Sequence, residues 1–185
     1  MNDDGGKVVL DGDDMRRTLV RIAHEIVEQH EGPQDLAIVG IQRRGAVLAE
    51  RLHAILCDLL EHPVPLGLVD ISFYRDDLST RSDTPEVHAT QIGFPVDGAT
   101  VVIVDDVLYT GRTVRAAIEA LFSFGRPATV RLAVLADRGH RELPIRPDYV
   151  GKNLPTSRSE RVNVRVVEID DVDEVTISTR AEVTR

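Results

Sequence analysis

The sequence predicts an α/β domain with a mainly parallel central sheet flanked by helices. Short apolar runs alternate with amphipathic segments along the chain, the pattern of parallel strands joined by helices. The run 101–104 is wholly apolar, as expected of a strand buried on both faces. A length of 185 residues suits one domain with a sizeable core, so we expect 1–185 to fold as a single domain.

Hydrophobic spacing sets the expected elements in chain order. The first helix shows apolar residues at helical spacing, with Asp13 or Asp14 as its cap. We expect little regular structure between 137 and 155, where Gly, Pro and Arg are frequent. The full expectation is a helix over about 13–30, a strand over 36–41, a helix ending near 60, a strand within 63–73, a strand over 101–104, a helix over 114–124, and strands over 129–136, 162–169 and near 175–178.

Composition and charge narrow the class of protein. Aromatic residues make up 4% and Trp is absent, which disfavours a platform for stacking single-stranded bases. The net charge of -9 is concentrated at the ends, with five acidic residues in 1–14 and five in 168–174. The stretch 15–167 holds 19 basic and 20 acidic residues, so a basic face for nucleic acid remains compatible with the overall charge.

The chain shows no targeting or membrane segment by its composition. Its first residues lack the basic and apolar regions of a signal peptide, and its apolar runs are too short to span a bilayer. We therefore expect a cytoplasmic protein with no membrane partner.

Residues 101–113 combine three sequence features that each suit a different part of a ligand. An apolar strand ends in Asp105 and Asp106, and a small-residue turn then opens a helix. Ligands bind at the carboxyl ends of open parallel sheets, and amides at a helix start, with the hydroxyls of Thr110 and Thr113, favour a phosphate. The carboxylates suit sugar hydroxyls and a divalent cation. In the structural alternative, the acid pair caps a strand and Gly111 only permits a turn.

The order of buried strand, acid pair, Thr-Gly-x-Thr and helix resembles the phosphoribosyl diphosphate (PRPP) motif of type I phosphoribosyltransferases. The resemblance implies that fold, with a flexible loop over about 74–91, a small hood over about 137–157, and Mg²⁺ bound with PRPP, in contact with Asp105 and Asp106 or with PRPP alone. The implied catalytic residues are Asp105, Asp106, Arg43, Arg44 and Arg75. The implied residues for PRPP or UMP are Val104, Asp105, Asp106, Val107, Leu108, Tyr109, Thr110, Gly111, Arg112, Thr113 and Arg138.

The turn 40–45 lies at another strand end and contains Arg43 and Arg44, which offer charge and N–H donors to a pyrophosphate. A solvated arginine pair before a helix is the alternative. By its resemblance to the pyrophosphate loop of these enzymes, we expect a non-proline cis peptide near Gln42-Arg43. Arg75 lies in the expected flexible loop and is the candidate to reach pyrophosphate; the alternative there is a loop without a role.

Four longer segments, 70–79, 104–116, 132–146 and 148–157, resemble the pyrimidine operon regulator (PyrR) family, as does the opening helix at 21–26. This resemblance implies a uracil phosphoribosyltransferase, which forms UMP and diphosphate from uracil and PRPP. It also implies binding of the pyr operon mRNA leader in the presence of UMP or UTP, and a homodimer or homotetramer. The implied RNA-binding residues are His24, His140, Arg141, Arg146 and Lys152.

One departure concerns the RNA target. Val20 and Arg43 stand where the best-known relatives have threonines, so a hydroxyl is lost and a charge is gained. Two other functions stay open at this point. A salvage enzyme for uracil, or even a purine, without an RNA role predicts acidic potential outside the active site. A nucleotide-sensing RNA binder with vestigial turnover retains both sites.

Overall fold

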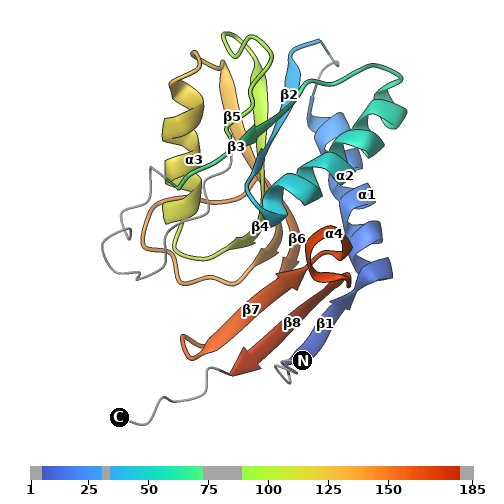
Figure 1. Cartoon of the computed structure of the whole chain (residues 1–185), viewed down its shortest axis with the longest axis vertical. Coiled ribbons are helices and arrows are strands. Elements are labelled where there is room, and N and C mark those ends of the chain that lie inside the picture. The colour runs from blue at the N-terminus through green and yellow to red at the C-terminus, as the bar shows by residue number, and fades with distance from the viewer. Residues whose placement is uncertain (1–5, 31–33, 73–88, 180–185) are drawn as a thin grey trace.

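The computed structural model describes residues 6–30, 34–72 and 89–179 (Figure 1). The expected flexible loop lies almost entirely outside these residues, and Arg75 lies outside them. In chain order the described elements are β1 (Lys7–Asp11), α1 (Gly12–Gln29), β2 (Leu36–Ile41), α2 (Arg44–Leu60), β3 (Leu66–Val69), β4 (Thr100–Leu108), α3 (Arg112–Phe122), β5 (Thr129–Asp137), β6 (Tyr149–Asn153), β7 (Glu160–Arg165), α4 (Val167–Asp170) and β8 (Glu174–Thr179).

The central sheet has five parallel strands in the order β3-β2-β4-β5-β6. Helices α1 and α2 cover one face of the sheet and α3 covers the other (Figure 1). Each face has its own hydrophobic core. Every residue of β2 is buried, because both faces of this inner strand are covered. The predicted α/β class with a mainly parallel sheet flanked by helices is therefore confirmed.

The amphipathic pattern of α1 and α2 explains how they pack. Met15, Ile22 and Ile26 on α1, and Leu48 and Leu52 on α2, are at most 1% exposed. Burying such a side chain contributes roughly 1.5–3 kcal/mol relative to leaving it in water. The two helices are thus held on the same face of the sheet, and this fixes the start of α2 beside β4.

A second sheet joins the two ends of the chain. Strands β1, β8 and β7 pair antiparallel in that order, and Figure 1 shows them below the central sheet. The carbonyls of Ser157 and Glu160 next to β7 accept hydrogen bonds from Arg138, which follows β5. The second sheet is therefore attached near the carboxyl ends of the central strands, where the candidate site lies.

The start of the first helix differs from the expectation. Asp11, rather than Asp13 or Asp14, is the N-cap, because its carboxylate accepts a 2.8 Å hydrogen bond from the amide of Asp14. The Asp14 carboxylate accepts in return from the amide of Asp11, which completes a capping box. Asp13 and Asp14 lie in the first turn, where negative charge also favours the helix.

Two further segments differ from their sequence patterns. Residues 149–153, expected to be irregular, form β6, because they find backbone partners along β5. The strand expected over 162–169 ends at Arg165, and α4 follows, where the Asp170 carboxylate accepts from the amide of Val166 at 2.9 Å. Within the described ranges, no helix is both long enough and apolar enough to cross a membrane.

Candidate functional site

The acid pair lies within the central strand of the sheet. Strand β4 continues through Asp105 and Asp106 to Leu108, because β5 supplies ladder partners as far as Asp137. Asp105 is 5% exposed, and its Oδ1 accepts a 2.9 Å bond from the amide of Asp106. Oδ1 of Asp106 accepts a 2.7 Å bond from the amide of Val107. These local bonds hold both carboxylates at the end of the strand.

A turn of three residues leads from β4 into α3. Gly111 has a φ of 93°, a conformation that favours glycine, and it serves as the N-cap without a side-chain hydrogen bond to the helix. Oγ1 of Thr110 accepts from the amide of Arg112 at 3.3 Å. The turn and the helix dipole together favour an anion at this end of α3. The geometry expected for a phosphate turn is thus present one step beyond the acid pair.

The second candidate loop meets the acid pair directly. The peptide bond between Gln42 and Arg43 is cis, as expected from the sequence, and α2 begins at the next residue, Arg44. A Cβ added to Gly45 would lie 2.8 Å from the carbonyl oxygen of Val104 and 3.1 Å from Oδ1 of Asp105. Only glycine allows this approach, so Gly45 belongs to the site although its role was not expected.

Arg44 is engaged by a carboxylate that the sequence pattern did not single out. Its Nη2 lies 2.5 Å from Oδ1 of Asp170, and its Nε donates to Oδ2 at 3.0 Å. Burial raises the pKa of Asp170, but the bonds from Arg44 and the amide of Val166, together with the charges of Arg44 and Arg165, keep that pKa below its ordinary value. Asp170, and to a lesser degree Asp106, raise the pKa of Arg44. Arg44 therefore ties the start of α2 to α4.

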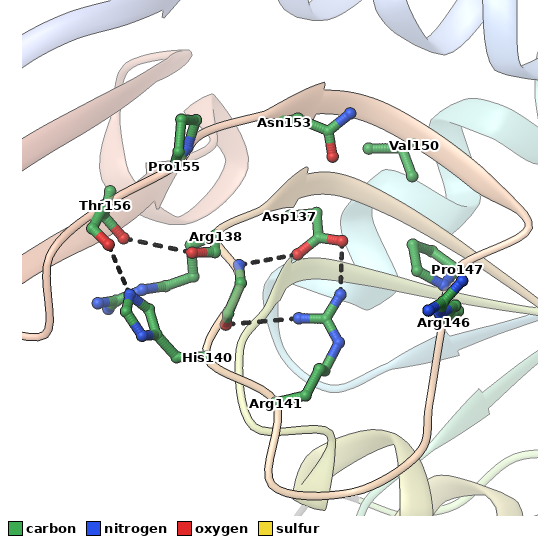
Figure 2. A pocket seen from close by; sticks show the side chains of 11 residues that line it. Asp137, Arg138, His140, Arg141, Arg146, Pro147, Val150, Asn153, Pro155 and Thr156 are labelled. Atoms are coloured by element: carbon green, nitrogen blue, oxygen red, sulfur yellow. Dashed lines mark hydrogen bonds and ion pairs between the residues drawn. The ribbon is translucent and has the colours of Figure 1, made fainter.

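A pocket of about 660 Å³ opens at the end of β5 and β6 (Figure 2). Arg141 shapes its wall, because its guanidinium bonds Asp137 at 2.5 Å and the carbonyls of Ile145 and Tyr109 at 2.9 Å each. The pocket is lined by Asp137, Arg138, Gly139, His140, Arg141, Arg146, Pro147, Val150, Asn153, Pro155 and Thr156.

Arg138 links this pocket to the phosphate turn. It is 8% exposed, its guanidinium lies 4.1 Å from the centroid of the Tyr109 ring, and its Nη2 donates to two carbonyls at the start of β7. Its Nε is buried without a hydrogen-bond partner among the described residues. His140 contacts the same ring edge-on, and its Nε2 lies 2.5 Å from the carbonyl of Thr156.

The remaining RNA candidates lie on neighbouring elements. His24 is exposed on α1, Lys152 is exposed on β6, and Arg146 is exposed at the pocket rim. Arg21 joins the first two elements, since its Nη2 donates to the carbonyls of Val150 and Gly151 at 3.0 and 2.6 Å. Arg21 was not among the candidates, although its position in the segment that resembles PyrR was a usable signal. Arg141, in contrast, is held largely within its own loop.

No cluster of three or more His, Cys, Asp or Glu side chains suited to a metal occurs in the described parts of the chain. The acid pair at the end of β4 stays the candidate contact for a cation that the sequence pattern suggested. Two carboxylates suit Mg²⁺ when a substrate phosphate supplies the other oxygens, because this ion keeps several non-protein ligands.

The parallel sheet, the acid pair and the phosphate turn are those of a type I phosphoribosyltransferase. Residues 7–171 match the model of the phosphoribosyl transferase domain. The fold is similar to a hypoxanthine phosphoribosyltransferase of Trypanosoma cruzi (TM-score 0.73, 22% identity, 96% of each chain). It is also similar to the hypoxanthine phosphoribosyltransferase of Staphylococcus aureus (TM-score 0.69, 21% identity, 96% of this chain and 94% of that one).

Closer relatives define the family. The chain is 60% identical to the Bifunctional protein PyrR of Roseiflexus sp. (strain RS-1), over 90% of this chain and 91% of that protein. It is 54% identical to the Bifunctional protein PyrR of Listeria welshimeri, over 95% of this chain and 97% of the relative. The chain therefore belongs to the PyrR family, as its sequence segments predicted.

Proposed function

We propose that the chain is a uracil phosphoribosyltransferase that also regulates pyrimidine biosynthesis by binding pyr operon mRNA when UMP or UTP is bound. The observation that carries the proposal is that the acid pair, the turn at the start of α3 and the pocket after β5 adjoin one another. Membership of the PyrR family supports both roles. We further propose that the protein acts in the cytoplasm as a homodimer or homotetramer.

The geometry supports one orientation of PRPP. Its ribose hydroxyls lie at Asp105 and Asp106, and its 5'-phosphate lies on the amides of the turn 109–113, where the helix dipole favours negative charge. Its pyrophosphate then extends towards Arg43 and Arg44 at the start of α2. The close approach of Gly45 to Asp105 brings the two loops near enough to hold one ligand.

Positive charge develops on the ribose during the reaction and negative charge on the leaving pyrophosphate, and the site has residues suited to stabilise each. The bond from the ribose carbon to the pyrophosphate oxygen breaks with its electron pair on oxygen, and a uracil nitrogen bonds to the carbon while its N–H proton passes to the diphosphate or to water. The acid pair favours the positive charge that develops on the ribose, while Arg43 and Arg44 favour the negative charge on the leaving group. No covalent bond to the protein is needed.

Mg²⁺ bound with PRPP would neutralise part of the charge on the leaving diphosphate. Asp105 and Asp106 would offer it at most two carboxylates, so PRPP itself supplies most of the oxygen ligands in this proposal. Asp105 and Asp106 hold the ribose end of this assembly.

The pocket in Figure 2 is the proposed site of the uracil ring. Uracil presents two carbonyl acceptors and an N–H donor, and the loop 138–141 that follows β5 brings polar groups to the wall of this pocket. Gly139 shapes this loop with a φ of 77°, and His140 follows with a φ of 61°. The loop contacts Tyr109 of the phosphate turn, so base and phosphate lie in one continuous site.

For the regulatory role, we propose an RNA surface that includes His24, His140, Arg141, Arg146 and Lys152. Arg146 and Lys152 are exposed and suit direct contacts with phosphate. Arg141 and His140 hold the pocket loop through internal bonds, so they act on RNA through the shape of that loop. Val20 and Arg43, which replace threonines of the best-known relatives, are expected to alter the affinity for RNA.

The double change Asp105→Asn and Asp106→Asn tests the catalytic proposal. We expect UMP synthesis to fall by roughly 100-fold or more, since both charges that favour the developing positive ribose are lost. Thermal unfolding measured by circular dichroism should stay close to that of the unaltered protein. Turnover near the normal rate in a folded double variant contradicts the assignment.

A further inference from the structure

Helix α2 presents two arginines to the segment between β7 and β8. Arg44 and Arg51 are seven residues apart, close to two helical turns, and therefore lie on the same face. Arg51 bonds Glu168 at 2.5 and 2.9 Å and Asp173 at 2.8 and 3.1 Å. Arg51 thus fastens the segment to the helix away from the candidate site.

The ion pair between Arg44 and Asp170 lies at the opposite end of the contact between α2 and this segment, beside the candidate pyrophosphate loop. Asp170 binds both Nε and Nη2 of Arg44, and it is fixed in turn by the amide of Val166 at 2.9 Å. The Asp170 side chain is 15% exposed, whereas the Arg44 side chain is 36% exposed. The carboxylate is therefore the more buried partner, and the arginine keeps part of its surface open to solvent.

The pair leaves donors for a further anion. It occupies Nε and Nη2, while Nη1 of Arg44 bonds none of the described residues. A guanidinium that is already held in place loses less side-chain freedom on binding an anion than a mobile one does. An arginine held by a carboxylate remains charged, so the attraction for phosphate is retained.

We propose that Asp170 is a positioning residue that holds Arg44 for the pyrophosphate group of PRPP. This inference rests on the proposed function, because it assigns Arg44 to the leaving group. Asp170 touches no reacting atom; it acts through Arg44 alone. The segment between β7 and β8 then contributes to PRPP affinity and not only to the stability of the second sheet.

Steady-state kinetics of the full chain with Asp170→Asn, Asp170→Glu and Asp173→Asn test the proposal. Asp173→Asn is the matched control, since it removes a carboxylate from the same segment but from the distant partner Arg51. For Asp170→Asn we expect the KM for PRPP and the Kd for inorganic pyrophosphate to rise roughly tenfold, about 1.4 kcal/mol. The KM for uracil should change less than about twofold, and Asp170→Glu should restore part of the loss.

The control separates positioning from stability. We expect Asp173→Asn to lower the melting temperature but to leave the KM for PRPP within about twofold. If Asp170→Asn does not fold, Asp170→Glu is compared with the control and should still raise the KM for PRPP alone. Equal effects at the two positions, or tighter pyrophosphate binding without Asp170, overturn the proposal. An unaltered chain that forms no UMP instead overturns the proposed function, while pyrophosphate binding still decides the role of Asp170.

Discussion

The guanidinium of Arg138 lies 4.1 Å from the ring centroid of Tyr109, so the pocket wall contacts the phosphate turn. The same guanidinium donates to the carbonyls of Ser157 and Glu160, which lead into the second sheet. His140 contacts the Tyr109 ring from a second direction. We therefore expect a nucleotide bound at the turn to affect the loop that carries His140 and Arg141, two of the candidate RNA-binding residues.

Tyr109→Leu is expected to weaken UMP binding several-fold, because the ring that holds Arg138 is lost. A cation above an aromatic face contributes roughly 0.5–2 kcal/mol, depending on its burial. Tyr109→Phe keeps the ring and is the control, with an affinity near normal. Titration calorimetry with UMP measures both. Equal affinities for the Leu and Phe variants speak against a role of the ring.

Gly45→Ala is expected to destabilise the fold and to reduce turnover. Its Cβ would lie 2.8 Å from the carbonyl oxygen of Val104 and 3.1 Å from Oδ1 of Asp105, so α2 and β4 must separate. Overpacking of this kind costs about 1–3 kcal/mol. The control is Gly93→Ala, where an added Cβ meets no atom within 4 Å. Chemical denaturation that finds both variants equally stable contradicts the close approach.

Arg146→Ala and Arg141→Ala are expected to affect RNA binding in different ways. Arg146 is exposed, so its loss should weaken RNA binding and lower the salt dependence by about one counterion without a change in melting temperature. Arg141→Ala should lower the melting temperature as well, because Asp137 loses its partner. Filter binding at several salt concentrations measures the RNA affinity of both variants and its salt dependence. An unchanged salt slope for Arg146→Ala places that residue outside the RNA surface.

The contact between α2 and the acidic segment predicts a dependence of stability on pH. Arg51 lowers the pKa of Glu168, and it also keeps the pKa of Asp173 below its ordinary value of 3.8 against the effect of burial. Groups with a lowered folded pKa stabilise above the unfolded pKa, and this stability is lost as pH falls through the folded value. We expect Arg51→Gln to melt below the unaltered protein at pH 7, with a gap that narrows below about pH 4.

Melting curves between pH 7 and pH 3 measure this gap. Lys7→Gln is a suitable control, since Lys7 lies on β1 and belongs to none of the ion pairs described for α2. A gap between Arg51→Gln and the unaltered protein that stays constant over this range argues against the ion pairs as its cause.

Local patterns were enough to predict the order of strand, turn and helix start that forms the candidate phosphate site. The apolar run, the acid pair and the Gly111 turn are contiguous, and each follows short-range rules of strands, turns and helix starts. The cis bond at Gln42-Arg43 followed from resemblance alone. Strand β4 nevertheless extends past the acid pair, because its partner β5 is long enough to continue the ladder. Partner length is a tertiary property that the local pattern does not contain.

The features that were missed depend on contacts between distant segments. Strand β1 is stabilised by pairing with β8 at the other end of the chain. Asp170 appeared only as one of several acidic residues, and its contact with Arg44 joins positions 126 residues apart. From the sequence, Arg141 was expected to be available to RNA. In the structure it bonds Asp137 and the carbonyl of Ile145, so it is held within the loop. The position of a charged residue in the sequence does not identify the residue that pairs with it in the fold.

The central claim is that one site serves both uracil turnover and RNA regulation. It is tested most directly by measuring UMP synthesis from uracil and PRPP beside binding of the organism's own pyr leader RNA, with and without UMP. We expect turnover, and RNA binding that UMP strengthens and that exceeds binding to random RNA of equal length. Binding to leader and random RNA with equal affinity, with or without UMP, contradicts the claim even if turnover is normal.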